Sequence, residues 1–251
     1  MSKETQFERF EKAPITEALL DIRAQLPRKI DLARLETFHD VVKDKYPTKR
    51  ERVLWQFGFQ AQPGATLETH KPSGGPDGYL FLSPDERQMA QARLDGFTLN
   101  RLKPYDKWET FRDEAKQLWQ HYIRIASPEC VTRLALRYIN RIEIPLPIRD
   151  LKDYILTTPE VAPGLPQSLD SFFMRLVLPE PRLQAAAIVT LTIEPIKDNK
   201  ILPLIFDIDV FREAVLNSND DELWGIMEQL CNFKNTIFFK SITEKTKELF
   251  R

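Results

Sequence analysis

The chain has 251 residues, of which 42% are hydrophobic and 29% charged, as expected for a globular protein with a sizeable core. Its formal net charge of -1 argues against a generic binder of nucleic acid or anionic membranes, because neither partner would meet a large positive field. Cys130 and Cys231 lie far apart without metal-ligand spacing, and no apolar run has the length of a signal segment or membrane span. We therefore predict a cytoplasmic protein that makes no use of a membrane.

The first half of the chain begins with a strand and a helix. Alternating apolar residues predict a strand over Ile15–Leu26. Asp31 is an N-cap candidate for a helix that runs to Lys45 and stops before Pro47. The remaining predicted elements of this half are strands over Val53–Gln60, Tyr79–Leu82, Gln88–Leu94 and Phe97–Leu102, a loop over Pro63–Gly78, and a helix that begins at Asp106 with Glu109 as its capping-box partner.

The second half shows a similar series of signals. A strand is predicted over Val131–Ile142, followed by a short helix from Asp150. Three further strands are predicted over Phe172–Leu178, Ala186–Ile193 and Leu202–Phe211, then a helix capped by Asn219 or Asp220 and a short C-terminal helix with Ser241 and Glu244 as its capping box.

The two halves match at an offset of 116 residues. This offset aligns Thr16 with Thr132, Leu20 with Leu136, and Trp108 with Trp224; these matches can also arise by coincidence, since few identities support them. We predict an α+β fold of two pseudo-symmetric strand-helix-three-strand-helix repeats, residues 1–128 and 129–251. The sheet should be mostly antiparallel, with the helices packed on one face of a single unit.

Three arginines share one face of the second-half strand, because Arg133, Arg137 and Arg141 are separated by multiples of two residues. They could bind an anion through forked hydrogen bonds. They could instead serve the structure, because the offset aligns Arg133 with Glu17 and Arg137 with Asp21, and equivalent strands that pair antiparallel would bring opposite charges together. We favour the structural interpretation.

Tyr138 is a further candidate for an anion site. It lies between Arg137 and Arg141, and a polar and aromatic cleft with Tyr105 could bind a small anionic ligand. Stacking of nucleic-acid bases there is disfavoured by the near-neutral charge of the chain.

Asp207 and Asp209 share one face of a later strand, and Glu194 is the nearest third carboxylate. Paired carboxylates of this kind can hold Mg²⁺ or Mn²⁺ in phosphoryl-transfer and nuclease sites. Acidic residues that alternate with apolar ones are more typical of a solvated sheet face. No cofactor is predicted, and no histidine, serine or cysteine has the spacing of a known catalytic motif.

One region of the chain resembles a known family. Asn100-Arg101-Leu102, then Pro104-Tyr105, then the helix headed by Trp108 precede the segment RLALRYINRI at 133–142; Ala13-Pro14-Ile15 and the segment FDIDVF at 206–211 complete the pattern. This combination resembles an uncharacterised, sporadically distributed prokaryotic protein family of about this length. The resemblance covers nearly the whole chain and implies an independent single-module protein, without an activity, cofactor or catalytic residue to transfer.

Three functions follow as expectations. The first is a non-enzymatic module that binds another protein, which the sporadic distribution associates with mobile-element or defence systems. The second is a metal-dependent phosphoryl-transfer or nuclease-type enzyme with Asp207, Asp209 and Glu194. The third is a binder of a small anionic ligand through Arg137, Tyr138 and Arg141.

Overall fold

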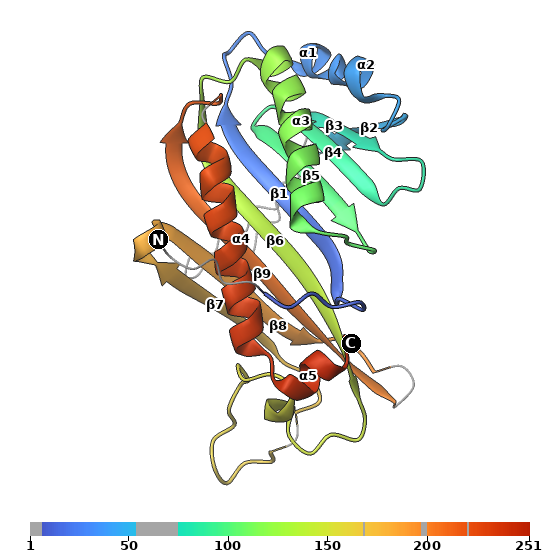
Figure 1. Ribbon diagram of the computed structural model, residues 1–251, viewed down its shortest axis with the longest axis vertical. Coiled ribbons are helices and arrows are strands. Elements are labelled where there is room, and N and C mark those ends of the chain that lie inside the picture. The colour runs from blue at the N-terminus through green and yellow to red at the C-terminus, as the bar shows by residue number, and fades with distance from the viewer. Residues whose placement is uncertain (1–6, 54–74, 168, 197–199, 220) are drawn as a thin grey trace, which may run out of the picture.

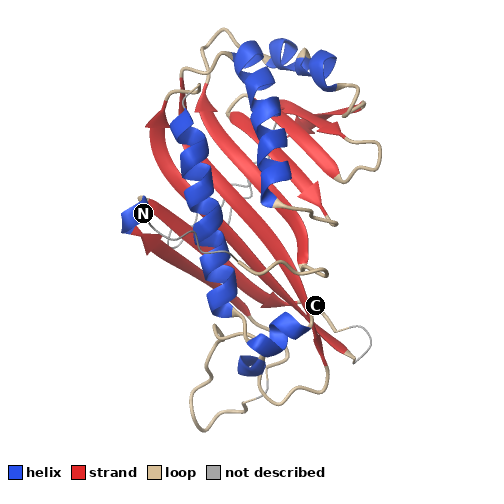
Figure 2. Ribbon diagram, in the orientation of Figure 1, coloured by secondary structure: helices blue, strands red, loops and turns tan. Residues whose placement is uncertain are grey.

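The computed structural model describes residues 7–53, 75–167, 169–196, 200–219 and 221–251. These residues form an α+β fold in which one antiparallel sheet of nine strands carries its helices on one face (Figures 1 and 2). The strands follow the order β2-β3-β4-β5-β1-β6-β9-β8-β7, and every neighbouring pair is antiparallel. The predicted fold class, α+β with a mostly antiparallel sheet, is confirmed.

The first half of the chain supplies one side of this sheet. Its elements are β1 (Ile15–Gln25), α1 (Leu32–Glu36), α2 (Phe38–Val42), β2 (Thr48–Val53), β3 (Pro76–Leu82), β4 (Gln88–Arg93), β5 (Gly96–Leu102) and α3 (Trp108–Ala126). The second half supplies the other side, with β6 (Cys130–Pro145), the 3₁₀ helix η1 (Leu151–Asp153), β7 (Phe173–Glu180), the 3₁₀ helix η2 (Pro181–Leu183), β8 (Ala185–Ile193), β9 (Ile201–Leu216), α4 (Asp221–Ser241) and α5 (Glu244–Glu248).

The two halves meet at the centre of the sheet, where β1 pairs with β6. In this register Leu20 lies opposite Leu136, and Ala18 and Ile22 lie opposite Tyr138 and Leu134. All six side chains are buried, at 1% exposure or less. They face the helices, because alternate residues of a strand point to the same side of the sheet.

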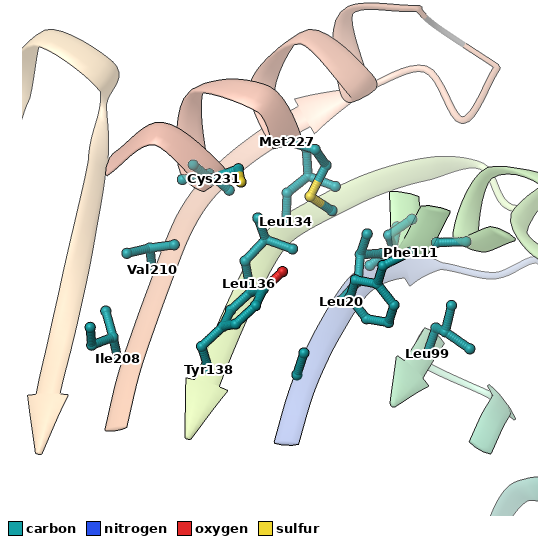
Figure 3. Close-up of a cluster of buried hydrophobic side chains, with 14 of the residues drawn as sticks. Leu20, Leu99, Phe111, Leu134, Leu136, Tyr138, Ile208, Val210, Met227 and Cys231 are labelled. Carbon is teal, nitrogen blue, oxygen red and sulfur yellow. The ribbon is translucent and has the colours of Figure 1, made fainter. Parts of the chain in front are cut away.

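The helices cover this face with apolar stripes. Figure 3 shows Leu134, Leu136 and Tyr138 of β6 on the same side as Met227 and Cys231 of α4. The equivalent stripe of α3 contains Phe111, Ala115, Leu118, Trp119 and Tyr122. Residues three and four apart on a helix fall on one side of it, so these patterns bury a continuous core between the helices and the sheet.

The opposite face of the sheet carries no helix among the described residues, and we call it the helix-free face. Its central side chains come from the alternate positions of β1, β6 and β9, which include Asp21, Arg137 and Asp209. The alternation that places leucines in the core therefore places charged residues together on this face.

Several predicted boundaries change in the structure. Asp31 does cap a helix, since its side chain accepts a hydrogen bond from the backbone N–H of Arg34. The predicted single helix to Lys45 is wrong, because the chain forms two short helices that meet at Thr37. Of the strand predicted over Val53–Gln60, Val53 ends β2, and the other residues lie outside the described residues.

Two predicted helix caps are wrong. Lys107 is the N-cap of α3, and Asp106 instead accepts a hydrogen bond from the Thr110 hydroxyl. Thr243 caps α5, because Ser241 still belongs to α4. Capping positions one or two residues apart are hard to separate in a sequence, since the choice depends on the direction in which the chain enters the helix.

The two halves do not contain the same series of elements. Among the described residues, four strands follow β1 in the first half and three follow β6 in the second, where η1 replaces the predicted short helix. The strand β2 was not predicted, because its sequence TKRERV has no alternating apolar pattern. The equal strand-helix-three-strand-helix order is therefore not confirmed.

Candidate functional site

The three predicted arginines of β6 lie on the helix-free face at the centre of the sheet. Arg133, Arg137 and Arg141 alternate with core residues, so strand geometry directs them to this side. We call these arginines and the carboxylates that contact them the arginine belt. The carboxylates are Asp21 of β1, Asp207 and Asp209 of β9, and Glu143 and Glu194 near the ends of β6 and β8.

Arg137 binds Asp207 in a forked geometry. Its Nε donates to both carboxylate oxygens, at 2.9 and 3.1 Å, and its Nη2 donates to Oδ2 at 2.6 Å. The aspartate side chain is 12% exposed and the arginine side chain 47%. These hydrogen bonds raise the pKa of Arg137, against the opposing effect of partial burial. Charge-assisted bidentate contacts are strong and directional, so this pair is a fixed part of the sheet.

Asp21 contacts arginine side chains from three strands. Its carboxylate lies 2.9 Å from the Nη2 of Arg93, 3.4 Å from the Nε of Arg23 and 3.5 Å from the Nη1 of Arg133. The Thr98 hydroxyl also donates to it, at 2.7 Å. Burial alone would raise the pKa of Asp21. The charges of Arg93 and Arg23 and the hydrogen bond from Thr98 outweigh this effect, so the pKa is lowered. Asp21 is therefore held as an anion.

Asp209 has the opposite electrostatic balance. Burial raises its pKa, helped by the negative charges of Asp207 and Asp21, and the charges of Arg133 and Arg137 do not compensate fully. Its contact with Arg133 is long, at 3.6 Å. The belt thus contains one carboxylate, Asp209, that is poorly stabilised as an anion. The carboxylates of Asp21 and Asp207 have closer arginine contacts.

Arg133 is the most loosely held arginine of the belt. Its contacts with Asp21 and Asp209 measure 3.5 and 3.6 Å, whereas charge-assisted hydrogen bonds to a guanidinium usually measure about 2.7 to 2.9 Å. Its guanidinium carbon lies 4.6 Å from the centre of the Phe211 ring, which holds the group in place from one side. An open groove of about 590 Å³ surrounds it, lined by Arg23, Thr132, Arg133, Asp209 and Glu213.

Arg141 occupies the far end of the belt. Its Nε donates to Glu194 at 2.9 Å, and its Nη1 contacts Glu143. Glu194, the third carboxylate of the predicted metal site, is thus ion-paired, as is Asp207. Among the residues that the structure describes, no group of three or more His, Cys, Asp or Glu side chains is arranged to hold a metal ion.

The carboxylates do not meet the arginines in the pairs that the repeat suggested. Glu17 lies opposite Ile139 and Asp21 opposite Ala135, so neither is directly across from an arginine of β6. The antiparallel register places Arg133 opposite Arg23 instead. Asp21 reaches Arg133 diagonally, and the remaining charge comes from β9, a strand whose position no local pattern reveals.

Tyr138 is separated from the arginines. It points to the helix side of β6, is 1% exposed, and its hydroxyl lies 2.8 Å from the hydroxyl of Tyr105. Burial raises the pKa of both phenols well above the ordinary range. The structure therefore places Tyr138 in the core and not beside Arg137 and Arg141 in one site.

A buried lysine next to Tyr138 was missed in the sequence. Lys234 of α4 places its Nζ 3.8 Å from the centre of the Tyr138 ring and donates to Asn235 at 2.5 Å. It forms no ion pair within the described part of the chain, and burial lowers its pKa. Burial also raises the pKa of Cys231 to about 11. The signal was available, because Lys234 follows Leu230 by four residues on the apolar stripe of α4.

Comparisons with known proteins add no relative to this geometry. Among the described residues, no helix combines the length and the apolar character that a membrane span requires. No model of a known protein family matches the chain, and a search of curated proteins returns no match either.

Proposed function

We propose that the protein is a non-enzymatic interaction module that binds another protein with the helix-free face of its sheet. The observation that supports this most is the groove at Arg133, where a guanidinium is held beside an aromatic ring but makes no short contact with a carboxylate. Arginine is a frequent anchor of protein interfaces, because a planar group with five donors can be desolvated and still satisfied by a partner.

The charges of the belt favour a protein partner over a nucleic acid. Carboxylates and guanidinium groups alternate across β1, β6 and β9, so the face offers no continuous positive field to a phosphate backbone. A surface of mixed sign can instead select a partner whose charges match in position. The Arg137–Asp207 pair fixes the geometry of the face, and Arg133 contributes donors that its own carboxylate neighbours contact only at 3.5 and 3.6 Å.

The experiment compares affinity capture from the native host with wild-type protein, Arg133→Gln and Arg124→Gln. Arg124 is exposed on α3, on the other face of the sheet, and serves as the matched control. We expect one protein to be recovered with the wild type and with Arg124→Gln, and to be lost with Arg133→Gln, all three having the same melting temperature. Equal recovery with Arg133→Gln would contradict the use of this face.

A small anionic ligand in the same groove is the second candidate function. The loosely engaged donors of Arg133 favour it, since a carboxylate or phosphate could replace the two long contacts with short ones. Inorganic phosphate and citrate should then raise the melting temperature of the wild type and not of Arg133→Gln, because a ligand stabilises the state that binds it. Calorimetric titration with Mn²⁺ tests the metal-dependent enzyme on the same sample, because Asp207, Asp209 and Glu194 would have to bind the ion.

We further infer that the module arose by duplication, with residues 1–128 and 129–251 as its two units. The offset of 116 residues equates Leu20 with Leu136, and these two residues lie directly opposite each other. The same offset equates Ala18 with Leu134 and Ile22 with Tyr138, and the pairs Ala18–Tyr138 and Ile22–Leu134 exchange under a twofold rotation. A partner of the belt would then bind across the junction of the two units.

A further inference from the structure

The two edges of the sheet differ in how they are protected against pairing with another strand. The edge strand β2 has the sequence TKRERV, with four consecutive charged residues and a register shift between Arg52 and Val53. Charged side chains and irregular pairing at an edge prevent the addition of further strands. One edge of this sheet is thus protected in the usual way.

The edge strand β7 is less protected, because Arg175 is the only charged residue before its last position and Pro179 lies near its end. It has the sequence FMRLVLPE and pairs with β8 over eight residues without a register shift. Phe173 is 71% exposed and Val177 is 55% exposed, and both lie on the helix-free face with Arg175. No described strand pairs with the outer side of β7. A regular apolar edge of this length presents a row of free backbone groups to an incoming strand.

Arg175 is the one basic residue of β7. It is exposed and forms no ion pair with any residue that the structure describes, unlike the arginines of the belt. The only acidic residue of the strand is Glu180, at its end, where the carboxylate caps η2 by accepting a hydrogen bond from the backbone N–H of Arg182. The edge is therefore apolar with a single free positive charge near its middle.

We propose that β7 receives an added strand from a partner protein, supplied as an extended segment with alternating apolar side chains and one carboxylate opposite Arg175. Strand addition joins backbone groups along the edge, and the side chains on alternate positions select the sequence. Phe173 and Val177 would contact the apolar positions, and Arg175 would contact the carboxylate. This surface is distinct from the arginine belt, so the inference goes beyond the proposed function.

Charge complementarity favours a different protein over a second copy of this chain. In an antiparallel pair of two β7 strands about a twofold axis, residues of the helix-free face oppose residues of the same face. Arg175 would then meet only Phe173, Arg175, Val177 or Pro179 of the other copy, none of which is acidic. Glu180 shares the helix side with Leu176 and could not reach it. A strand of another sequence can supply the carboxylate that β7 lacks on this face.

The test measures binding of a fluorescent eight-residue peptide of alternating valine and threonine with one glutamate at its centre. Two control peptides have lysine in place of glutamate, or N-methyl groups on alternate backbone amides. We expect saturable binding of the glutamate peptide to the full-length protein, and binding about tenfold weaker for both controls, because each removes either the charge pair or the backbone hydrogen bonds.

Three variants of the protein complete the test. Val177→Lys should weaken binding about tenfold by charging the edge, whereas Val215→Lys, at an 83% exposed valine of β9, should not. Arg175→Glu should reverse the preference, so that the lysine peptide binds more tightly than the glutamate peptide. Equal binding of the N-methylated peptide, or an unchanged preference in Arg175→Glu, would overturn the proposal. Concentration-dependent dimerisation that Val177→Lys abolishes would also overturn it, because the occupant would then be a second copy.

Discussion

Arg137 of β6 and Asp207 of β9 are joined by three hydrogen bonds of 2.6 to 3.1 Å on the helix-free face. One of these residues was a candidate for binding an anion and the other for binding a metal ion. Each instead has the other as its partner, so the charges that resemble two sites in the sequence form one ion pair in the fold.

Loss of this pair should destabilise the protein. We expect Arg137→Ala to lower the free energy of unfolding by about 2 kcal/mol, because it leaves the largely buried carboxylate of Asp207 without its main partner. Urea denaturation measures the change. Arg175→Ala is the matched control on the same face, and it should stay within about 0.5 kcal/mol of the wild type, because Arg175 is exposed and forms no ion pair with a described residue.

The pH dependence of stability should distinguish Asp21 from Asp209. The pKa of Asp21 is lowered in the folded protein, so its contribution is complete above the ordinary value of 3.8 and is lost as the pH falls through the folded value. The pKa of Asp209 is raised, so its ionisation opposes folding at neutral pH and no longer does so below 3.8.

Asparagine substitutions at these two positions should therefore have opposite effects. At pH 7, Asp21→Asn should lower the free energy of unfolding by about 1 to 2 kcal/mol, and Asp209→Asn should leave it unchanged or raise it by about 1 kcal/mol. Both differences should shrink in urea denaturation at pH 3. A loss of stability in Asp209→Asn as large as that in Asp21→Asn would contradict this account of the belt.

Lys234 should limit stability at neutral pH. Burial lowers its pKa below the ordinary value of 10.5, so the charged form opposes folding most strongly below the folded pKa and less as the pH rises towards 10.5. Lys234→Met should raise the free energy of unfolding by about 1 kcal/mol at pH 7 and by less at pH 10. Thermal unfolding at the two pH values measures this, and an equal effect at both would exclude the charge as the cause.

Gly96 should tolerate no side chain. A Cβ at this position would lie 2.1 Å from the carbonyl oxygen of Ile22, and the backbone φ of 141° is one that L-residues rarely adopt. Gly96→Ala should lower the free energy of unfolding by about 3 kcal/mol. Gly225→Ala is the contrasting variant, because Gly225 lies in α4 with nothing within 4 Å of its Cβ position. This substitution should raise the free energy of unfolding by about 1 kcal/mol.

Much of the sheet was predictable because its strands have local signals. The two central strands alternate apolar and polar residues, and the hairpin of β3 and β4 has turn residues between its strands. Signals of this kind depend on a few neighbouring residues, so a sequence contains them completely. The edge strand β2 was not predicted, because its charged sequence lacks the alternation of apolar and polar residues that a half-buried strand shows.

The candidate site was only partly predictable. The sequence determined that Arg133, Arg137 and Arg141 share one side of a strand, and that Asp207 and Asp209 share one side of another, because the two-residue period of a strand is a local property. The same period places Tyr138 on the side opposite Arg137, and the predicted anion site of Arg137, Tyr138 and Arg141 did not take this into account.

Only the tertiary structure decided which of these residues meet. β9 is the neighbour of β6 in the sheet although β7 and β8 separate the two strands along the chain, so the contact between Arg137 and Asp207 joins residues 70 positions apart. The choice of neighbouring strand and its register depends on the packing of the whole core, which no local pattern contains. The sequence by itself therefore determined which side of its own strand each charged residue takes. The order of the strands decided which carboxylate each arginine of the belt contacts, and that Arg133 is left loosely held.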